Sequence, residues 1–279
     1  MLVDVHIHLS PPYLISDRLD YIRDEPGLEI LYSDPKANLT GIDDLLRDLD
    51  QAGVDKALVM GFPYGYEERA KRHNDWLLEI SSKYKGRLLP LAAFDPRAPW
   101  AFKHAEDFLN AGGFGLGELC VYDEGLSDLQ IEALAALGQL CRVKNSVLLV
   151  HVNEPVGHQY PGKAPMEIGQ IYRLVKRCQE VKLILAHFGG GLPLLATFKK
   201  EVRDFLSSVR FDTAAMPYLF EPLALRQGLD ILGATSFVLG TDYPLLKTAR
   251  YQKYFEKAGL RPEELKAING QSAADFLGL

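Results

Sequence analysis

The chain has 279 residues, of which 47% are hydrophobic and 24% charged, so it contains enough apolar material for one large core. Its net charge is −6 and it has no long basic run, so we do not expect a nucleic-acid partner. The three cysteines are scattered and odd in number, which argues against a disulfide framework and a cysteine-based zinc site. The N-terminus lacks a signal-peptide pattern and no apolar run approaches the ~20 residues of a membrane span, so we expect a cytoplasmic protein with no membrane partner.

Short apolar segments alternate along the chain with amphipathic stretches. Strands are predicted at residues 2–9, 54–62, 87–94, 113–120, 147–153, 182–187, 209–213 and 237–242. Several are nearly continuous hydrophobic runs, such as KALVM and VLLVHV, which are typical of parallel strands buried on both faces. Helices are predicted between the strands, at residues 41–52, 67–84, 100–111, 127–144, 165–180, 193–207 and 221–232.

This alternation predicts a single-domain α/β fold, a (β/α)₈ TIM barrel over residues 1–279. A doubly wound open sheet is the alternative that the pattern alone leaves open. Two connections, residues 10–39 and 154–164, are longer than the others. In a barrel both would lie on the face that carries active sites, where long loops form lids or specificity walls.

Histidines and acids stand at the ends of five predicted strands. The candidate metal ligands are His6, His8, Glu118, His151, His187 and Asp242. Each has an ordinary structural explanation on its own, but burying so many ionisable groups together is costly unless a cation pairs them. Alternation along the first strand places Asp4 on the same face as His6 and His8, where it would orient a ligand by hydrogen bonding. The other candidates considered, His73 and His104, fall on predicted helices, and we expect them to be solvated and without a role.

Five segments resemble, in order, motifs of the amidohydrolase superfamily. They are DVHIH, LLVHVNE, LAHFGGGLP, VLGTDYP and NGQSAADFLGL, and they span the whole chain. Within the superfamily they resemble the amidohydrolase-2 group, which includes the aminocarboxymuconate semialdehyde decarboxylase-like enzymes. The fourth strand departs from this group, because it reads GLGEL where a GVK-like sequence is common. GLGEL resembles the TatD-type deoxyribonucleases, in which a strand-four glutamate bridges two metals, so Glu118 is expected either to bridge two ions or to neighbour a single one.

The ligand types suit Zn²⁺, with Mn²⁺, Fe²⁺, Co²⁺ or Ni²⁺ as alternatives, in a site of one or two ions. The metal would lower the pKa of bound water toward ~7, and Asp242 would take the proton and pass it to the leaving group. With one metal, His187 would polarise the substrate. With two, His151 and His187 would hold the second ion.

The expected reaction is hydrolysis of an amide, ester or lactone of a small molecule. The alternative is non-oxidative decarboxylation of a small unsaturated or aromatic acid, and a third possibility is a non-enzymatic metal-binding barrel. Four side chains of the loop after the fifth strand are candidate substrate contacts, unless that loop is simply a polar surface: Glu154, His158, Tyr160 and Lys163. The expected partners are this small-molecule substrate and, at most, further copies of the chain.

Overall fold

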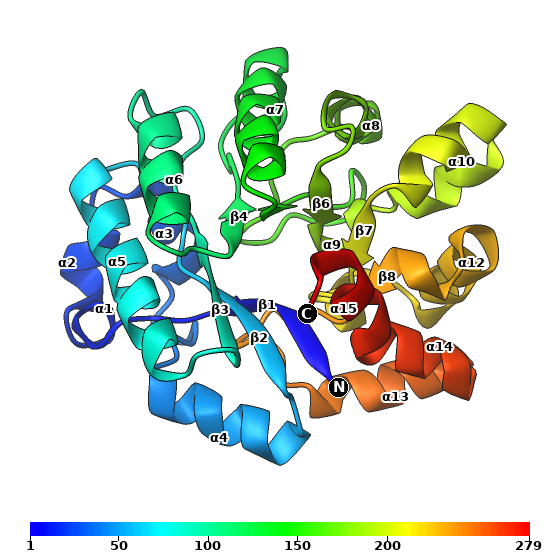
Figure 1. Cartoon of the computed structure of the whole chain (residues 1–279), viewed down its shortest axis with the longest axis horizontal. Helices are drawn as coiled ribbons and strands as arrows, with labels where there is room; N and C mark the ends of the chain where they lie inside the picture. Colours follow the sequence, from blue (N-terminus) through cyan, green and yellow to red (C-terminus); the bar gives the residue numbers. More distant parts are fainter.

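Eight parallel strands, hydrogen-bonded in chain order, form the centre of the computed structural model, which describes residues 1–279 (Figure 1). The strands are β1 (Val3–His8), β2 (Lys56–Met60), β3 (Leu88–Ala92), β4 (Gly115–Leu119), β5 (Val147–Val150), β6 (Lys182–Leu185), β7 (Arg210–Asp212) and β8 (Phe237–Val238). The last strand meets the first, because the Val5 N–H donates to Leu239 O at 2.8 Å and the Asp242 N–H donates to His6 O at 2.9 Å. The sheet is therefore a closed barrel, as predicted, and not an open sheet.

Helices surround the barrel (Figure 1). The outer helices are α4 (Ile42–Ala52), α5 (Glu67–Lys83), α6 (Ala101–Asn110), α7 (Asp128–Val143), α8 (Ile168–Arg177), α10 (Lys200–Ser207), α12 (Pro222–Leu232) and α13 (Ala249–Lys257). Predicted helix 193–207 is divided in the structure, into the 3-10 helix η1 (Leu192–Thr197) and α10. No helix has both the length and the apolar composition that a membrane crossing requires.

The two ends of the barrel are covered differently. Residues after β1 form the short helices α1 (Pro12–Ser16), α2 (Arg18–Ile22) and α3 (Pro26–Tyr32), and two more short helices follow later strands, α9 (Ala186–Gly189) and α11 (Met216–Leu219). The C-terminal segment, for which the sequence analysis made no prediction, contains η2 (Ala234–Ser236), α14 (Pro262–Lys266), η3 (Ala267–Gln271) and α15 (Ser272–Leu277). Helix α15 closes the amino-terminal end of the barrel, where Ala273 and Leu277 join the buried cluster of Val3 and Val5.

Two strands carry a β-bulge where they enter the site. In β1 the register with β2 shifts between Asp4 and Ile7, so that Asp4 pairs with Ala57 while His8 pairs with Met60. Because Ala57 and Met60 lie on opposite faces of their strand and paired residues share a face, Asp4 and His8 lie on opposite faces too. The predicted common face of Asp4, His6 and His8 is therefore wrong for Asp4.

The second bulge lies in β4, where the register with β5 shifts between Leu116 and Leu119. The two residues within it are Gly117 and Glu118. Gly117 has φ 146°, and a Cβ there would stand 2.7 Å from Cβ of Leu149, so only glycine fits this backbone. Bulges re-aim side chains beside active sites, and this one lets Glu118 enter the barrel.

Candidate metal centre

The two histidines of β1 face each other inside the barrel. His6 is fully buried and His8 nearly so, and their Nε2 atoms are 3.3 Å apart. The Nδ1 atom of His6 lies 2.8 Å from Oδ2 of Asp212, and Nδ1 of His8 lies 2.9 Å from Gly61 O. Both partners only accept, so each ring donates from Nδ1 and turns the lone pair of Nε2 into the site.

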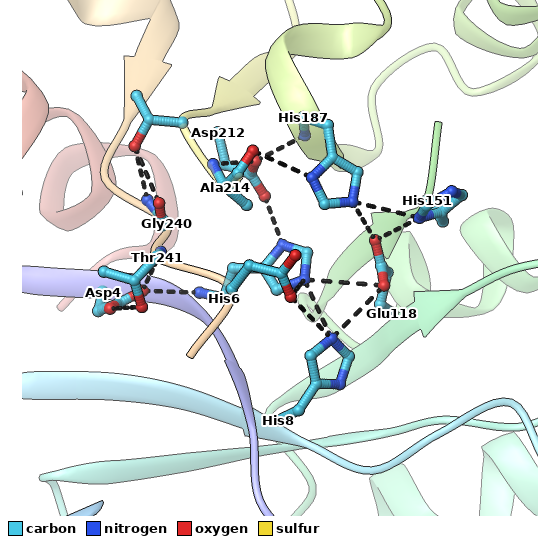
Figure 2. Close-up of polar contacts among 12 residues, drawn as sticks. Asp4, His6, His8, Glu118, His151, His187, Asp212, Ala214, Gly240 and Thr241 are labelled. Atoms are coloured by element: carbon cyan, nitrogen blue, oxygen red, sulfur yellow. Dashed lines mark hydrogen bonds and ion pairs between the residues drawn. The ribbon is translucent and has the colours of Figure 1, made fainter. Parts of the chain in front are cut away.

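Glu118 lies between two groups of histidines (Figure 2). Its Oε1 is 2.9 Å from Nδ1 of His151 and 3.2 Å from Nε2 of His187. Its Oε2 points the other way and is 3.6 Å and 3.7 Å from the Nε2 atoms of His8 and His6. One carboxylate therefore spans the two halves of the cluster.

The backbone after β6 holds His187 in an uncommon conformation. His187 and the next residue, Phe188, have φ values of 52° and 58°. The N–H of His187 donates to Oδ1 of Asp212 at 2.8 Å, and its Nδ1 lies 3.0 Å from Ala214 O. These contacts leave Nε2 facing the cluster. Positive φ is uncommon for residues other than glycine and is frequent at functional sites.

Asp242 follows β8 and completes the cluster. Its φ is 61°, and its Oδ1 lies 3.4 Å from Nε2 of His8 and 3.6 Å from Nε2 of His6. The preceding residue, Thr241, donates from its hydroxyl to Asp4 at 2.6 Å. Asp4 therefore holds the backbone beside Asp242 and does not enter the histidine cluster (Figure 2).

Asp212, at the end of β7, was not among the predicted site residues. It is fully buried and accepts hydrogen bonds from the ring of His6 and from the backbone of His187 and Ala214. It thereby fixes two candidate ligands at once. The signal was present in the sequence, since Asp212 is an acid near the end of predicted strand 209–213, which is the same criterion that selected the others.

The carboxylates determine the charge of the site. Burial raises the pKa of Glu118, but the charges of the facing histidines outweigh burial and hold that pKa well below its usual range. The same balance brings the pKa of Asp242 to about 2. Burial lowers the pKa of His187, whereas the hydrogen bond and charge of Glu118 raise it, with a net value of about 9. Burial also lowers the pKa of His6, but Glu118 and Asp212 raise it well above normal. Without a metal, these acids therefore draw protons onto the imidazoles.

The donors fit a divalent cation. Three overlapping sets place their ligand atoms within 4.8 Å of one another: His6, His8 and Glu118; His6, His187 and Asp242; and Glu118, His151 and His187. The Nε2 atom of His151 is buried and has no hydrogen-bond partner. Imidazole lone pairs aimed at one another beside ionised carboxylates repel unless a positive charge lies between them. All six predicted ligands are thus brought together by the fold.

A cavity of about 650 Å³ opens above this cluster. Of the predicted substrate contacts, His158 and Tyr160 line it, whereas Glu154 and Lys163 do not. The Nζ atom of Lys163 lies 2.8 Å from the carboxylate of Glu154, which also accepts from the Tyr160 hydroxyl at 2.8 Å. These two charged residues hold the loop together. The cavity is also lined by residues that the sequence analysis did not single out, among them Tyr32, Lys36, Tyr122 and Tyr218.

His73 and His104 lie on helices as predicted, but they are buried and not solvated. His73 bonds through Nε2 to Leu9 O at 2.8 Å and through Nδ1 to the Tyr64 hydroxyl at 2.8 Å, and burial lowers its pKa to about 4. His104 bonds to the side chain of Asn74 at 2.9 Å. Both are hydrogen-bonded core histidines. The three cysteines are buried and form no disulfide.

Solved structures with the same fold include several decarboxylases. The 5-carboxyvanillate decarboxylase of Sphingomonas paucimobilis superposes with a TM-score of 0.74 at 15% identity, covering 100% of this chain and 99% of the other. The dihydroxybenzoic acid decarboxylase of Polaromonas sp. JS666, solved with bound manganese and the inhibitor 2-nitroresorcinol, gives 0.70 at 17% identity, covering 100% and 97%. The 2,6-dihydroxybenzoate decarboxylase of Rhizobium gives 0.70 at 16% identity, covering 99% and 98%. At this identity the likeness establishes the fold.

The sequence itself identifies the family. No curated protein matches it detectably. The family model Amidohydro_2, described as amidohydrolase, matches residues 3–279, which is nearly the whole chain and includes every residue of the histidine–carboxylate cluster. The chain therefore belongs to the amidohydrolase family.

Proposed function

We propose that this protein is a metal-dependent, non-oxidative decarboxylase of a small aromatic or unsaturated carboxylic acid. The observation that carries the proposal is the cluster of four histidines and two carboxylates at the floor of a cavity of about 650 Å³. The same barrel serves decarboxylases of hydroxylated aromatic acids among its structural relatives. This proposal takes the place of hydrolysis, the reaction that the sequence favoured, because the structural relatives described above are decarboxylases.

The metal would be held by His6, His8, His151 and Asp242, with His187 and Glu118 as ligands or immediate neighbours. When bound, it would supply Lewis-acid polarisation of the substrate oxygens and fix their position. A relative carries manganese, so Mn²⁺ is the first metal to test, ahead of the Zn²⁺ that ligand chemistry alone favours.

The residues around the cavity can meet the needs of decarboxylation. The bond between the substrate carbon and its carboxylate breaks, carbon dioxide leaves, and the electron pair remaining on carbon must receive a proton. His187 is at the cavity floor with its Nε2 facing the cluster, so if it neighbours the metal and does not bind it, its imidazole can deliver that proton. The rings of Tyr32 and Tyr122 in the wall offer surfaces on which an aromatic substrate can pack.

The direct test is to reconstitute the protein with Mn²⁺ or Zn²⁺ and incubate it in ¹⁸O-labelled water with a panel of hydroxybenzoates and, separately, with small esters and lactones. We expect release of carbon dioxide and replacement of the carboxylate by hydrogen, with no solvent oxygen in the organic product. Chelated protein and the Asp242→Asn variant serve as controls. An ¹⁸O-labelled product formed from an ester or lactone, with no acid in the panel decarboxylated, would contradict the proposal.

Hydrolysis remains the second candidate because of the position of Glu118. Its two oxygens face separate pairs of histidines, as a carboxylate bridging two ions would. A binuclear centre suits a bridging hydroxide and hence hydrolysis. Elemental analysis of the bound metal distinguishes the two candidates. About two equivalents of metal per chain in the wild type, reduced to about one in Glu118→Gln, would favour the hydrolase.

A further inference from the structure

A second cavity, of about 400 Å³, lies beside the metal cavity and is rich in cations. It is lined by residues of α11, the start of α12 and α13, and the last two helices contact each other. Three of its lining residues are Arg250, Lys253 and Lys257, all on α13. The only acid that lines it is Glu221, immediately before α12.

The three cations share one face of α13. Positions i, i+3 and i+7 lie on the same side of a helix, and Arg250 and Lys257 are separated by about 10 Å along its axis. Like charges at this spacing repel one another. The protein as a whole carries a net charge of −6. The lining of this cavity, with three cations and one acid, therefore has the opposite sign of charge.

None of these cations forms an ion pair within the chain, although pairing is the rule on other helices. The bridges Lys71–Asp75, Lys103–Asp107, Lys200–Asp204 and Arg226–Asp230 all join residues four apart. On α13 no side chain offsets Arg250, Lys253 or Lys257, and Glu256 instead accepts a hydrogen bond from Gln252 at 3.2 Å. A concave surface with three uncompensated cations favours a compact, multiply charged anion.

We propose that Arg250, Lys253 and Lys257 bind a phosphate-bearing ligand in this cavity. Arginine and lysine donors complement phosphate oxygens, and a span of about 10 Å accommodates more than one phosphoryl group. The site is separate from the metal centre, and the proposal does not depend on the reaction catalysed there.

The structure also connects this cavity to the metal centre. Tyr218 and Leu219 of α11 line both cavities, so a ligand on α13 contacts the wall of the metal cavity. The hydroxyl of Tyr251 on α13 donates to Thr241 O at 3.0 Å, next to Asp242. The hydroxyl of Tyr254 donates to Phe220 O at 3.2 Å, which holds α13 against the segment between α11 and α12.

Isothermal titration calorimetry on the metal-loaded full chain tests the site directly, with inorganic phosphate and ADP as probes. The test variant carries Arg250→Gln, Lys253→Gln and Lys257→Gln. The control carries Lys199→Gln, Arg203→Gln and Lys266→Gln, which remove equal charge from exposed residues that form no ion pair. All six side chains are exposed, so both variants should fold, which circular dichroism would verify.

We expect at least one probe to bind saturably, with affinity reduced about tenfold or more in the test variant and less than about twofold in the control. Binding should weaken as salt is raised. Tighter binding of ADP than of phosphate would identify the ligand of this site as a nucleotide. Equal or weaker binding of ADP would identify it as a free phosphate anion. Saturable binding of neither probe, or equal affinity in the wild type and the test variant, would overturn the proposal. If phosphate bound only to the metal, its affinity would be equal in the wild type and the test variant.

Discussion

At the level of single residues, Asp242 combines a negative charge beside the histidines with a backbone conformation that few residues adopt. We expect Asp242→Asn to lower turnover by about 10²–10⁴ or more, because an amide cannot accept a proton and is a neutral, poorer ligand. The fold should survive, since asparagine tolerates the φ of 61° better than most residues. Steady-state kinetics on remetallated protein, with the thermal unfolding midpoint measured alongside, separates the two effects. Near wild-type turnover would remove Asp242 from the site.

Asp212 makes contacts that asparagine cannot reproduce. Its Oδ2 accepts from the His6 ring while its Oδ1 accepts from the backbone of His187 and Ala214, so both oxygens face donors. In Asp212→Asn the new NH₂ must face one of these donors, leaving a buried group unsatisfied at a cost of about 1–3 kcal/mol.

We therefore expect Asp212→Asn to bind metal about 10- to 100-fold more weakly and to unfold at lower denaturant concentration than the wild type. Metal titration followed by urea unfolding provides both readouts. Asp204→Asn, on the exposed face of α10, is the matched control. Unchanged metal affinity in Asp212→Asn would show that the orientation of His6 does not depend on this carboxylate.

Metal binding should release protons. In the metal-free protein the pKa of His187 is about 9 and that of His6 is well above its normal value, so both are protonated at neutral pH. A metal needs the bare lone pair, so affinity should rise by about tenfold per pH unit for each proton released, and the contribution of His187 should end above about pH 9. Calorimetry in two buffers of different ionisation enthalpy counts these protons. A pH-independent affinity between about pH 6 and 9 would mean that neither histidine is a ligand.

At the level of elements, the strand ends around the site are packed too closely to accept larger residues. A Cβ on Gly240, just after β8, would stand 2.9 Å from Cβ of His6 and 3.1 Å from Cβ of Asp212. Gly240→Ala should therefore destabilise the barrel by about 1–3 kcal/mol and weaken metal binding, because two strands must move apart.

Gly169→Ala is the matched control for that substitution. Gly169 lies in the first turn of α8, and a Cβ there would meet no atom within 4 Å. The change should stabilise the protein by about 0.4–1 kcal/mol and leave metal affinity unaltered. Urea unfolding of both variants, with and without metal, measures the difference. Equal stability of the two alanine variants would show that the strand ends can relax.

At the scale of the whole molecule, the metal should contribute stability to the entire barrel, because its proposed ligands come from β1, β4 and the segments after β5, β6 and β8. At a free metal concentration of 100 times the dissociation constant, linkage gives about 2.7 kcal/mol. For a chain of 279 residues that corresponds to a rise in melting temperature of roughly 5 °C.

The stabilisation should also depend on pH in a defined direction. Protonated His187 stabilises the metal-free fold fully below its ordinary pKa of 6.5, and this contribution is lost as the pH rises through about 9. The gap in melting temperature between metal-loaded and chelated protein should thus widen over this range. Scanning calorimetry at several pH values tests it, and a gap that narrows over the same range would contradict the assignment.

The order of the strands and the proximity of the predicted ligands could be obtained from the sequence. Buried parallel strands are apolar on both faces, so runs such as KALVM can be recognised as strands. The carboxyl ends of all strands in a barrel lie at the same end of it. His151, His187 and Asp242 could accordingly be placed together without knowledge of the packing. The helices after Asp242 could not be placed in this way, because no further strand follows them and α15 packs against the end of the barrel.

Only the tertiary structure decided which side chains reach one another. Alternation with a period of two fails where a bulge inserts a residue, so the orientations of Asp4 and Glu118 depend on the register with the neighbouring strands. The charges of Glu154 and Lys163 neutralise each other across a turn of the loop, which composition does not reveal. The role of Asp212 depends on donors that are far apart in the chain, the ring of His6 on β1 and the backbone N–H of His187 after β6. The sequence shows which ionisable side chains stand at the ends of strands, because strands can be recognised from local patterns. Which of these side chains pair with one another depends on distances in space, and those are set only when the chain folds.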